Sequence, residues 1–167
     1  MRFALATGAV LALFACTPAF AETLAKPTGA VILEVSGAIA NTNEDGKAGF
    51  DMAMLDALTQ RTTVTHSPWY DGSRTFAGPL GSALLAAVGA SGTTLKVTAL
   101  NDYVSEIPMS DFTDHPVILA TSLEGEPMSV REKGPIFIIY PFDEQPALNN
   151  ETYYSRSAWQ VKSIEIY

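Results

Sequence analysis

Few side chains in this 167-residue sequence could bind a metal ion. There are two histidines, His66 and His115, and a single cysteine, Cys16. A zinc or transition-metal site needs three or four histidine, cysteine or carboxylate ligands that converge on one point. Because the two histidines are far apart in the sequence and not at i, i+4 spacing, the sequence predicts no metal site.

The residues that could act in nucleophilic, phosphate or acid–base chemistry also lack the required context. Ser82 follows a glycine, but the G-x-S-x-G turn of a serine hydrolase is missing. No G-x-G-x-x-G or G-K-[ST] sequence follows an expected strand, so no phosphate loop is predicted. Asp111 with Asp114, and Asp143 with Glu144, lie in polar turns, where carboxylates are usually solvated. We therefore assign no catalytic residue.

Three segments combine aromatic and polar side chains near the ends of expected strands. They are 65–72 (THSPWYDG), 100–103 (LNDY) and 153–159 (YYSRSAW). Aromatic faces with a few amides and hydroxyls suit a flat heterocycle or the surface of a partner. The alternative is that Trp69 and Trp159 are core aromatics with one solvated edge.

The elements that must position these segments follow from the hydrophobic period and the turn residues. We expect strands at 30–37, 61–65, 95–100, 117–123, 136–140 and 158–166. The continuous apolar run 136–140 is typical of a strand buried on both faces. Helices are expected at 51–58, with Asp51 as N-cap, and at 80–88, ending at Gly89. Residues 41–49 read as a loop and 124–127 as a turn. Six or seven strands with two or three short helices predict one α+β domain with mixed sheets.

The N-terminus has the pattern of a secretory signal peptide. Arg2 precedes the apolar run Phe3–Ala15, and a small-residue A-x-A pattern ends at Ala21. The run is shorter than the roughly 20 residues that a membrane-spanning helix needs. We therefore expect cleavage after Ala21, a periplasmic domain of residues 22–167, and no stable membrane insertion afterwards. The alternative, a lipoprotein cut before Cys16, has a weaker motif.

Composition narrows the class of partner. Ten Lys and Arg against 18 Asp and Glu give a net charge of −8, which disfavours nucleic acid as a partner. Hydrophobic residues make up 47% and charged residues 17%, so the chain is not intrinsically disordered. If Cys16 is removed with the signal peptide, the exported chain has no thiol.

Several ordered segments carry a resemblance to a known family. They are F-x-G-x-L-x-x-x-L-L-x-x-V-G (76–89), V-x-A-L-N-D-Y-x-x-x-I-P (97–108), V-I-L-A-x-x-x-x-G-E-P-M (117–128), K-G-P-I-F-I-I-Y-P (133–141) and W-x-V-x-x-I-E (159–165). The sequence resembles the oxidoreductase molybdopterin-binding domain of the sulfite oxidase family, in particular its small exported single-domain members. The resemblance covers about residues 31–166. It implies a sulfite oxidase-type molybdopterin-binding fold, with mixed β-sheets and a few short helices around a pterin pocket.

The resemblance also implies how molybdenum would be held, and this chain departs from it. Catalytic members use a pyranopterin dithiolene and one cysteine thiolate, just past a strand and four residues before a tryptophan. In this chain Thr65 stands at that position before Trp69, and a slip of one residue would place His66 there. A threonine hydroxyl is a neutral, hard donor, whereas a thiolate is charged and soft. We therefore do not expect the family's oxo-transfer or electron-transfer chemistry here.

The resemblance and the aromatic segments together define the candidate site. Arg131, Lys133 and Arg156 are candidates for gripping a pterin phosphate or another anion. The full set of candidate binding residues is Thr65, His66, Trp69, Asn101, Tyr103, Arg131, Lys133, Arg156 and Trp159.

Three functions remain open at this point. We expect a non-catalytic module that binds a small anionic or heterocyclic ligand, or a periplasmic or membrane sensor protein. The alternative is a molybdopterin-dependent oxidoreductase that uses His66 or no protein ligand. The third is an interaction protein with a vestigial pocket. The leader has Arg2 alone and no twin arginine, which indicates export of an unfolded chain without cofactor, so no cofactor is expected.

Overall fold

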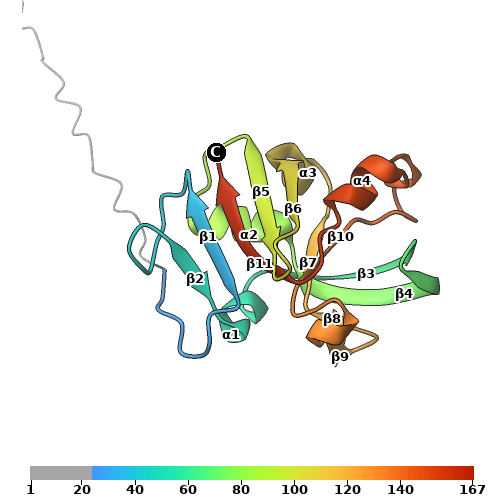
Figure 1. The fold of residues 1–167 in the computed structure, drawn as a ribbon, viewed down its shortest axis with the longest axis horizontal. Coiled ribbons are helices and arrows are strands. Elements are labelled where there is room, and N and C mark those ends of the chain that lie inside the picture. The colour runs from blue at the N-terminus through green and yellow to red at the C-terminus, as the bar shows by residue number, and fades with distance from the viewer. Residues whose placement is uncertain (1–23) are drawn as a thin grey trace, which may run out of the picture.

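The computed structural model describes residues 24–167 (Figure 1). The signal peptide expected at residues 1–21, including Cys16, lies outside the described residues. Among residues 24–167, no helix has both the length and the apolar character needed to cross a bilayer.

The largest sheet has five strands and is mixed, as the sequence predicted. Its spatial order is β2 (Ala48–Phe50), β1 (Leu33–Gly37), β11 (Val161–Ile166), β5 (Thr94–Ala99) and β6 (Val104–Pro108). The pair β1 and β11 is parallel, and all other neighbours are antiparallel. Along β5, alternate side chains are buried, because one face packs on the core and the other is partly solvated. Figure 1 shows this sheet on the left, with α2 (Gly81–Val88) behind it.

A second sheet is built on a long hairpin that extends away from the first (Figure 1). Its order is β3 (Gln60–Ser67), β4 (Tyr70–Pro79), β8 (Ser122–Leu123) and β9 (Glu126–Pro127). The two-residue turn at the hairpin tip consists of Pro68 and Trp69. The hairpin therefore carries Trp69 to the far end of the sheet.

A two-stranded sheet of β7 (Ile118–Ala120) and β10 (Phe137–Ile139) separates two hydrophobic cores. On β10, Ile138 belongs to the larger core, which lies against the five-stranded sheet. Its neighbours Phe137 and Ile139 belong to the smaller core, which lies against the hairpin. Residues 136–140 are all fully buried, so the prediction of a strand buried on both faces is confirmed.

The two predicted helices form where expected. α1 (Met52–Asp56) begins at Asp51, whose Oδ1 accepts a hydrogen bond from the Met54 N–H at 2.9 Å. The other oxygen of Asp51 accepts from the Gly29 N–H at 2.7 Å, so the cap also ties the N-terminal segment to the helix. These backbone donors, Gly29 first, lower the pKa of Asp51 below its ordinary value. α2 (Gly81–Val88) ends at Gly89, which has a left-handed conformation with φ of 60°.

Several elements are missing from the sequence predictions. They are β2, β4, β6, β9, α3 (Met109–Asp114), α4 (Glu151–Arg156) and the 3₁₀ turns η1 (Val130–Glu132) and η2 (Pro146–Leu148). The prediction of six or seven strands is therefore too low, since the described residues contain eleven. The expected loop 41–49 ends in β2, and the aromatic segment 153–159 begins inside α4. These elements are short or polar, and pairing with distant segments decides their conformation.

Candidate functional site

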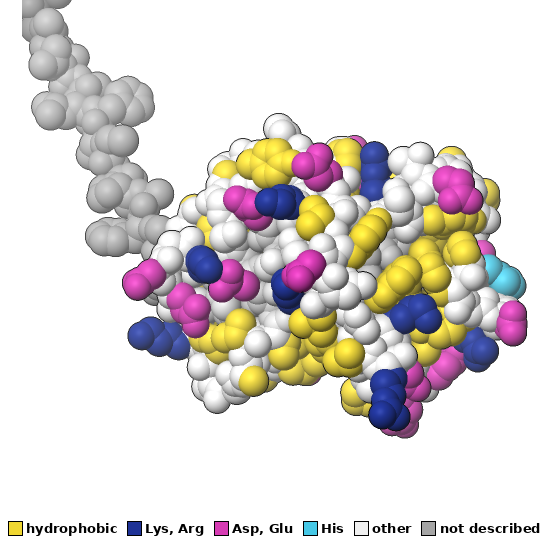
Figure 2. All heavy atoms as spheres, viewed as in Figure 1, with side chains coloured by type: hydrophobic (Ala, Val, Ile, Leu, Met, Phe, Trp, Pro, Cys, Tyr) yellow, Lys and Arg dark blue, Asp and Glu magenta, His cyan; other side chains and the backbone are white. Residues whose placement is uncertain are grey.

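A cavity of about 390 Å³ lies between the hairpin tip, the end of β5 and α4. It is lined by Pro68, Trp69, Ala99, Asn101, Tyr103, Glu151, Tyr154, Ser155, Ser157 and Trp159. Figure 2 shows hydrophobic side chains gathered in this region, between the positions that α4 and the β3–β4 hairpin occupy in Figure 1. The volume is within the range of about 300–1,000 Å³ that is usual for small-molecule sites.

Aromatic rings form the walls of the cavity and hold each other in place. The Trp69 ring lies 5.9 Å from that of Trp159 and 6.0 Å from that of Tyr154, at interplanar angles of 69° and 78°. Trp69 also packs edge-on against buried Phe137, at 5.2 Å between centroids. The Tyr154 hydroxyl is hydrogen-bonded to the side chain of Asn149. Such edge-to-face pairs favour one arrangement of the rings, so the walls are preformed.

Hydrogen bonds join the polar side of the cavity to α4. The Tyr103 hydroxyl donates to the Ser155 carbonyl at 2.9 Å, and the Ser105 hydroxyl donates to the same oxygen at 3.0 Å. Asn101 Oδ1 accepts from the Tyr103 N–H at 3.1 Å, which shapes the turn after β5. The loop between β5 and β6 is therefore fixed against α4.

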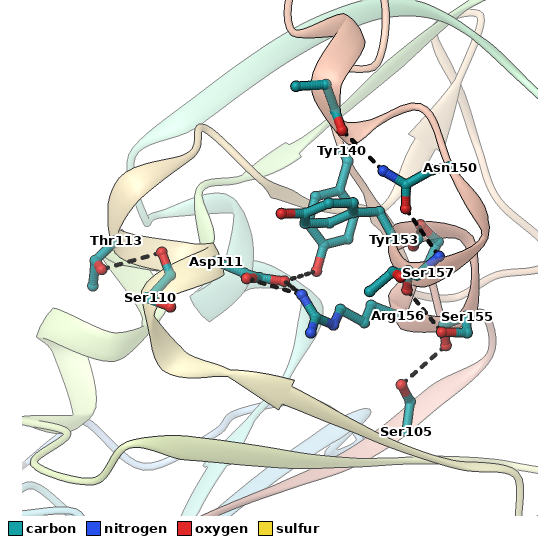
Figure 3. Close-up of polar contacts among 12 residues, drawn as sticks. Ser105, Ser110, Asp111, Thr113, Tyr140, Asn150, Tyr153, Ser155, Arg156 and Ser157 are labelled. Carbon is teal, nitrogen blue, oxygen red and sulfur yellow. Dashed lines mark hydrogen bonds and ion pairs between the residues drawn. The ribbon is translucent and has the colours of Figure 1, made fainter.

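A part-buried ion pair between Arg156, the last residue of α4, and Asp111 anchors the helix to the domain (Figure 3). Arg156 Nη1 lies 3.0 Å from Asp111 Oδ2, and the Tyr140 hydroxyl donates to the same oxygen at 2.8 Å. The Asp111 side chain is 6% exposed and that of Arg156 is 22% exposed. Burial, followed by the charge of Asp111, raises the pKa of Tyr140 above its ordinary value, so its hydroxyl remains a donor. Arg156 is thus paired with a carboxylate and is not among the residues that line the cavity.

Thr65 and His66 do not fit the metal-ligand role that the resemblance implies. The Thr65 side chain is fully buried, and its Oγ1 donates to the His66 carbonyl at 3.1 Å. The same oxygen accepts from the Asp143 N–H at 3.2 Å. His66 points to solvent, with Nδ1 2.8 Å from Asp143 Oδ2. Both side chains hold the 143–144 turn against β3, and neither lines the cavity.

The two remaining predicted cations also lie away from the cavity lining. Arg131 is exposed on η1. Lys133 Nζ lies 4.6 Å above the centroid of the Tyr70 ring, in a cation–π contact. The described residues contain no group of three or more His, Cys, Asp or Glu side chains placed to hold a metal ion.

The structure thus brings together four of the nine candidate residues, Trp69, Asn101, Tyr103 and Trp159. It separates Thr65, His66, Arg131, Lys133 and Arg156 from them. Of the lining residues outside the candidate set, Tyr154, Ser155 and Ser157 belong to the aromatic segment that the sequence singled out. Glu151 was missed, although Asn150 just before it is a typical N-cap residue, and its side chain accepts from the Thr152 N–H.

A second, wider hollow lies near the first described residues. It is lined by Leu24, Lys26, Pro27, Gly29, Val31, Glu34, Thr42, Asn43, Glu44, Asp45 and Lys47. Its charged residues are of both signs and include the exposed pair Lys47–Glu34. Because it contains no aromatic ring and none of the candidate residues, we take the smaller cavity as the candidate site.

Comparisons with known proteins give one kind of match. No family model matches the sequence, and no curated protein matches it. The structure is similar to the crystal structure of the sulfane dehydrogenase SoxCD from Paracoccus pantotrophus, with a TM-score of 0.59 and 20% sequence identity. The match covers 81% of this chain and 37% of that chain, so this chain spans little more than a third of its length. The likeness shows the fold, and the predicted sulfite oxidase-type α+β architecture is confirmed.

Proposed function

We propose that this protein is a periplasmic binding module that uses a sulfite oxidase-type fold to hold a small molecule without redox turnover. The observation that carries the proposal is the aromatic cavity. Segments from the hairpin tip, the β5–β6 loop and the α4 region, distant in sequence, converge there on Trp69 and Trp159. A concave site with a few polar groups among aromatic rings is typical of ligand binding.

The lining offers groups for binding and orientation rather than for covalent chemistry. It contains no cysteine, histidine or lysine. The hydroxyls of Ser155 and Ser157 donate to the backbone carbonyls of Thr152 and Tyr153, and neither is placed beside a base. The rings exclude water from the ligand, while Asn101 and Glu151 supply polar contacts.

The state of Thr65 supports a non-catalytic role. A metal ligand needs a free donor atom, but this hydroxyl is buried and engaged with two backbone groups. Residues 24–167 contain no thiol to replace it. Sulfur ligation of molybdenum by the protein is therefore unsupported in this part of the chain.

The proposal is tested on the full chain expressed with its own leader and purified from the periplasm. We expect the mass of a mature chain that begins at Glu22. The purified protein should contain far less than one molybdenum atom or oxidised pterin per chain. Native mass spectrometry should show a bound small molecule that is lost on Asn101→Ala. Lys96→Ala serves as the control, because Lys96 lies in an exposed pair with Glu165 outside the cavity. Stoichiometric molybdenum would overturn the proposal in favour of an oxidoreductase.

A further inference from the structure

The charged side chains around the cavity do not favour binding of an anion through a basic residue. Glu151 is the single charged side chain among the lining residues. The four basic side chains after residue 130 lie outside the lining: Arg156 is paired with Asp111, Lys162 is paired with Asp102 at 2.7 Å, Lys133 lies over Tyr70, and Arg131 is exposed on η1. The chain as a whole carries a net charge of −8. The surrounding potential therefore favours a cation over an anion.

The ring geometry favours a compact group over a flat one. A flat heterocycle is best held between parallel faces, but Trp69 is steeply inclined to both Trp159 and Tyr154. Rings inclined in this way form a corner rather than a parallel slot, and a corner suits a rounded group better than a flat one. The face of an aromatic ring is electron-rich and attracts a cation, and tryptophan does so most strongly. Aromatic enclosures of this kind recognise quaternary ammonium and methylated amine groups.

Glu151 supplies the complementary charge. It lies in the first turn of α4 and is exposed, and its side chain has no ion-pair or hydrogen-bond partner among residues 24–167. Its carboxylate is thus available to a ligand that enters beside Tyr154. A carboxylate next to aromatic walls stabilises a cation through both charge and cation–π attraction.

From these three observations we infer that the cavity binds the quaternary ammonium or methylated amine group of a small organic cation. The inference rests on the proposed binding function and names its ligand class. Trp69, Tyr154 and Trp159 hold the cationic group, and Glu151 balances its charge.

Tryptophan fluorescence provides a direct assay, because the chain has two tryptophans and both line the cavity. The full-chain protein is titrated with choline and tetramethylammonium, with 3,3-dimethylbutan-1-ol as the neutral isostere of choline, and with inorganic phosphate. We expect a saturable change in fluorescence with both cations and no binding of phosphate. The isostere should bind at least about tenfold more weakly than choline, because it lacks the charge that makes a desolvated cation–π contact.

Paired glutamate variants isolate the role of the carboxylate. Glu151→Gln should weaken choline binding by about tenfold, since it removes one close charge and keeps the shape. Glu126→Gln on β9 is the matched control, because Glu126 is exposed and outside the lining, and it should leave binding unchanged. Calorimetry repeats the titration in case ligand contact does not alter the fluorescence.

The possible negative results distinguish a wrong ligand class from a wrong proposed function. Equal binding of choline and its isostere, or an unchanged Glu151→Gln variant, would keep a small-molecule cavity and overturn the cationic ligand. If neither cation binds, the inference is overturned, and the native mass spectrum decides the proposed function by itself.

Discussion

Removal of the Arg156 side chain tests whether this residue anchors α4. In Arg156→Ala, Asp111 would keep the Tyr140 hydroxyl as a partner but would lose its counter-charge while 6% exposed. Breaking a buried pair from one side costs about 3–5 kcal/mol. Arg156 is 22% exposed, so water can enter its place, and we expect the lower end, about 3 kcal/mol.

The loss is measured by urea unfolding, followed by tryptophan fluorescence, and by calorimetry. For a domain of this size, about 3 kcal/mol corresponds to a fall in Tm of roughly 6–12 °C. Lys96→Ala is the matched control, because its pair with Glu165 at 3.3 Å is exposed on both sides. Surface pairs contribute about 0–1 kcal/mol, so the control should melt close to the unmodified protein.

A double-mutant cycle separates the pair from the individual side chains. The double variant Asp111→Asn with Arg156→Met removes both charges. Its loss of stability should therefore be smaller, by about 1–3 kcal/mol, than the summed losses of the single variants Asp111→Asn and Arg156→Met. If Arg156→Ala lowered the free energy of unfolding by less than about 1 kcal/mol, the side chain would not be an anchor.

Three further predictions concern other parts of the fold. Asp51→Asn should reduce stability at neutral pH and flatten the decline of stability in acid. Because the pKa of Asp51 is lowered in the folded state, its contribution to stability is present above the unfolded-state pKa of about 3.9 and is lost as the pH falls through the folded-state pKa. Urea unfolding between pH 2 and 7 measures this dependence. Gly78→Ala would place a methyl group against the Leu119 carbonyl, where β4 crosses β7, and should cost about 3 kcal/mol or more by calorimetry; an unchanged Tm would mean that the strands can separate there. Thr65→Val would remove the acceptor of the part-buried Asp143 N–H and should cost about 0.5–1.5 kcal/mol in urea unfolding; a neutral result would contradict the structural role of this hydroxyl.

Elements whose local chemistry agrees with the fold could be predicted from the sequence. Asp51 caps α1 and Gly89 ends α2, because a capping carboxylate and a left-handed glycine act within a few residues. The apolar run 136–140 predicted a strand buried on both faces, because no polar side chain interrupts it. β4 was missed, because its polar first half follows the hairpin turn and has no alternating pattern of its own.

The candidate site was predicted in part. Aromatic and amide side chains near strand ends pointed to Trp69, Asn101, Tyr103 and Trp159, which line one cavity. Arg156 looks like an anion ligand in the sequence, but its partner Asp111 is 45 residues away and comes close only in the folded chain.

The sequence by itself determined the class of the domain, its acidic charge and the residue types that its site could use, because composition, period and caps are local properties. The tertiary structure alone decided which of these residues line a common cavity. Long-range packing turns Thr65 inward to the backbone, pairs Arg156 with Asp111, and leaves Glu151 as the charge beside the aromatic walls. Side-chain orientation and partnership depend on contacts between distant segments, and no local pattern encodes them.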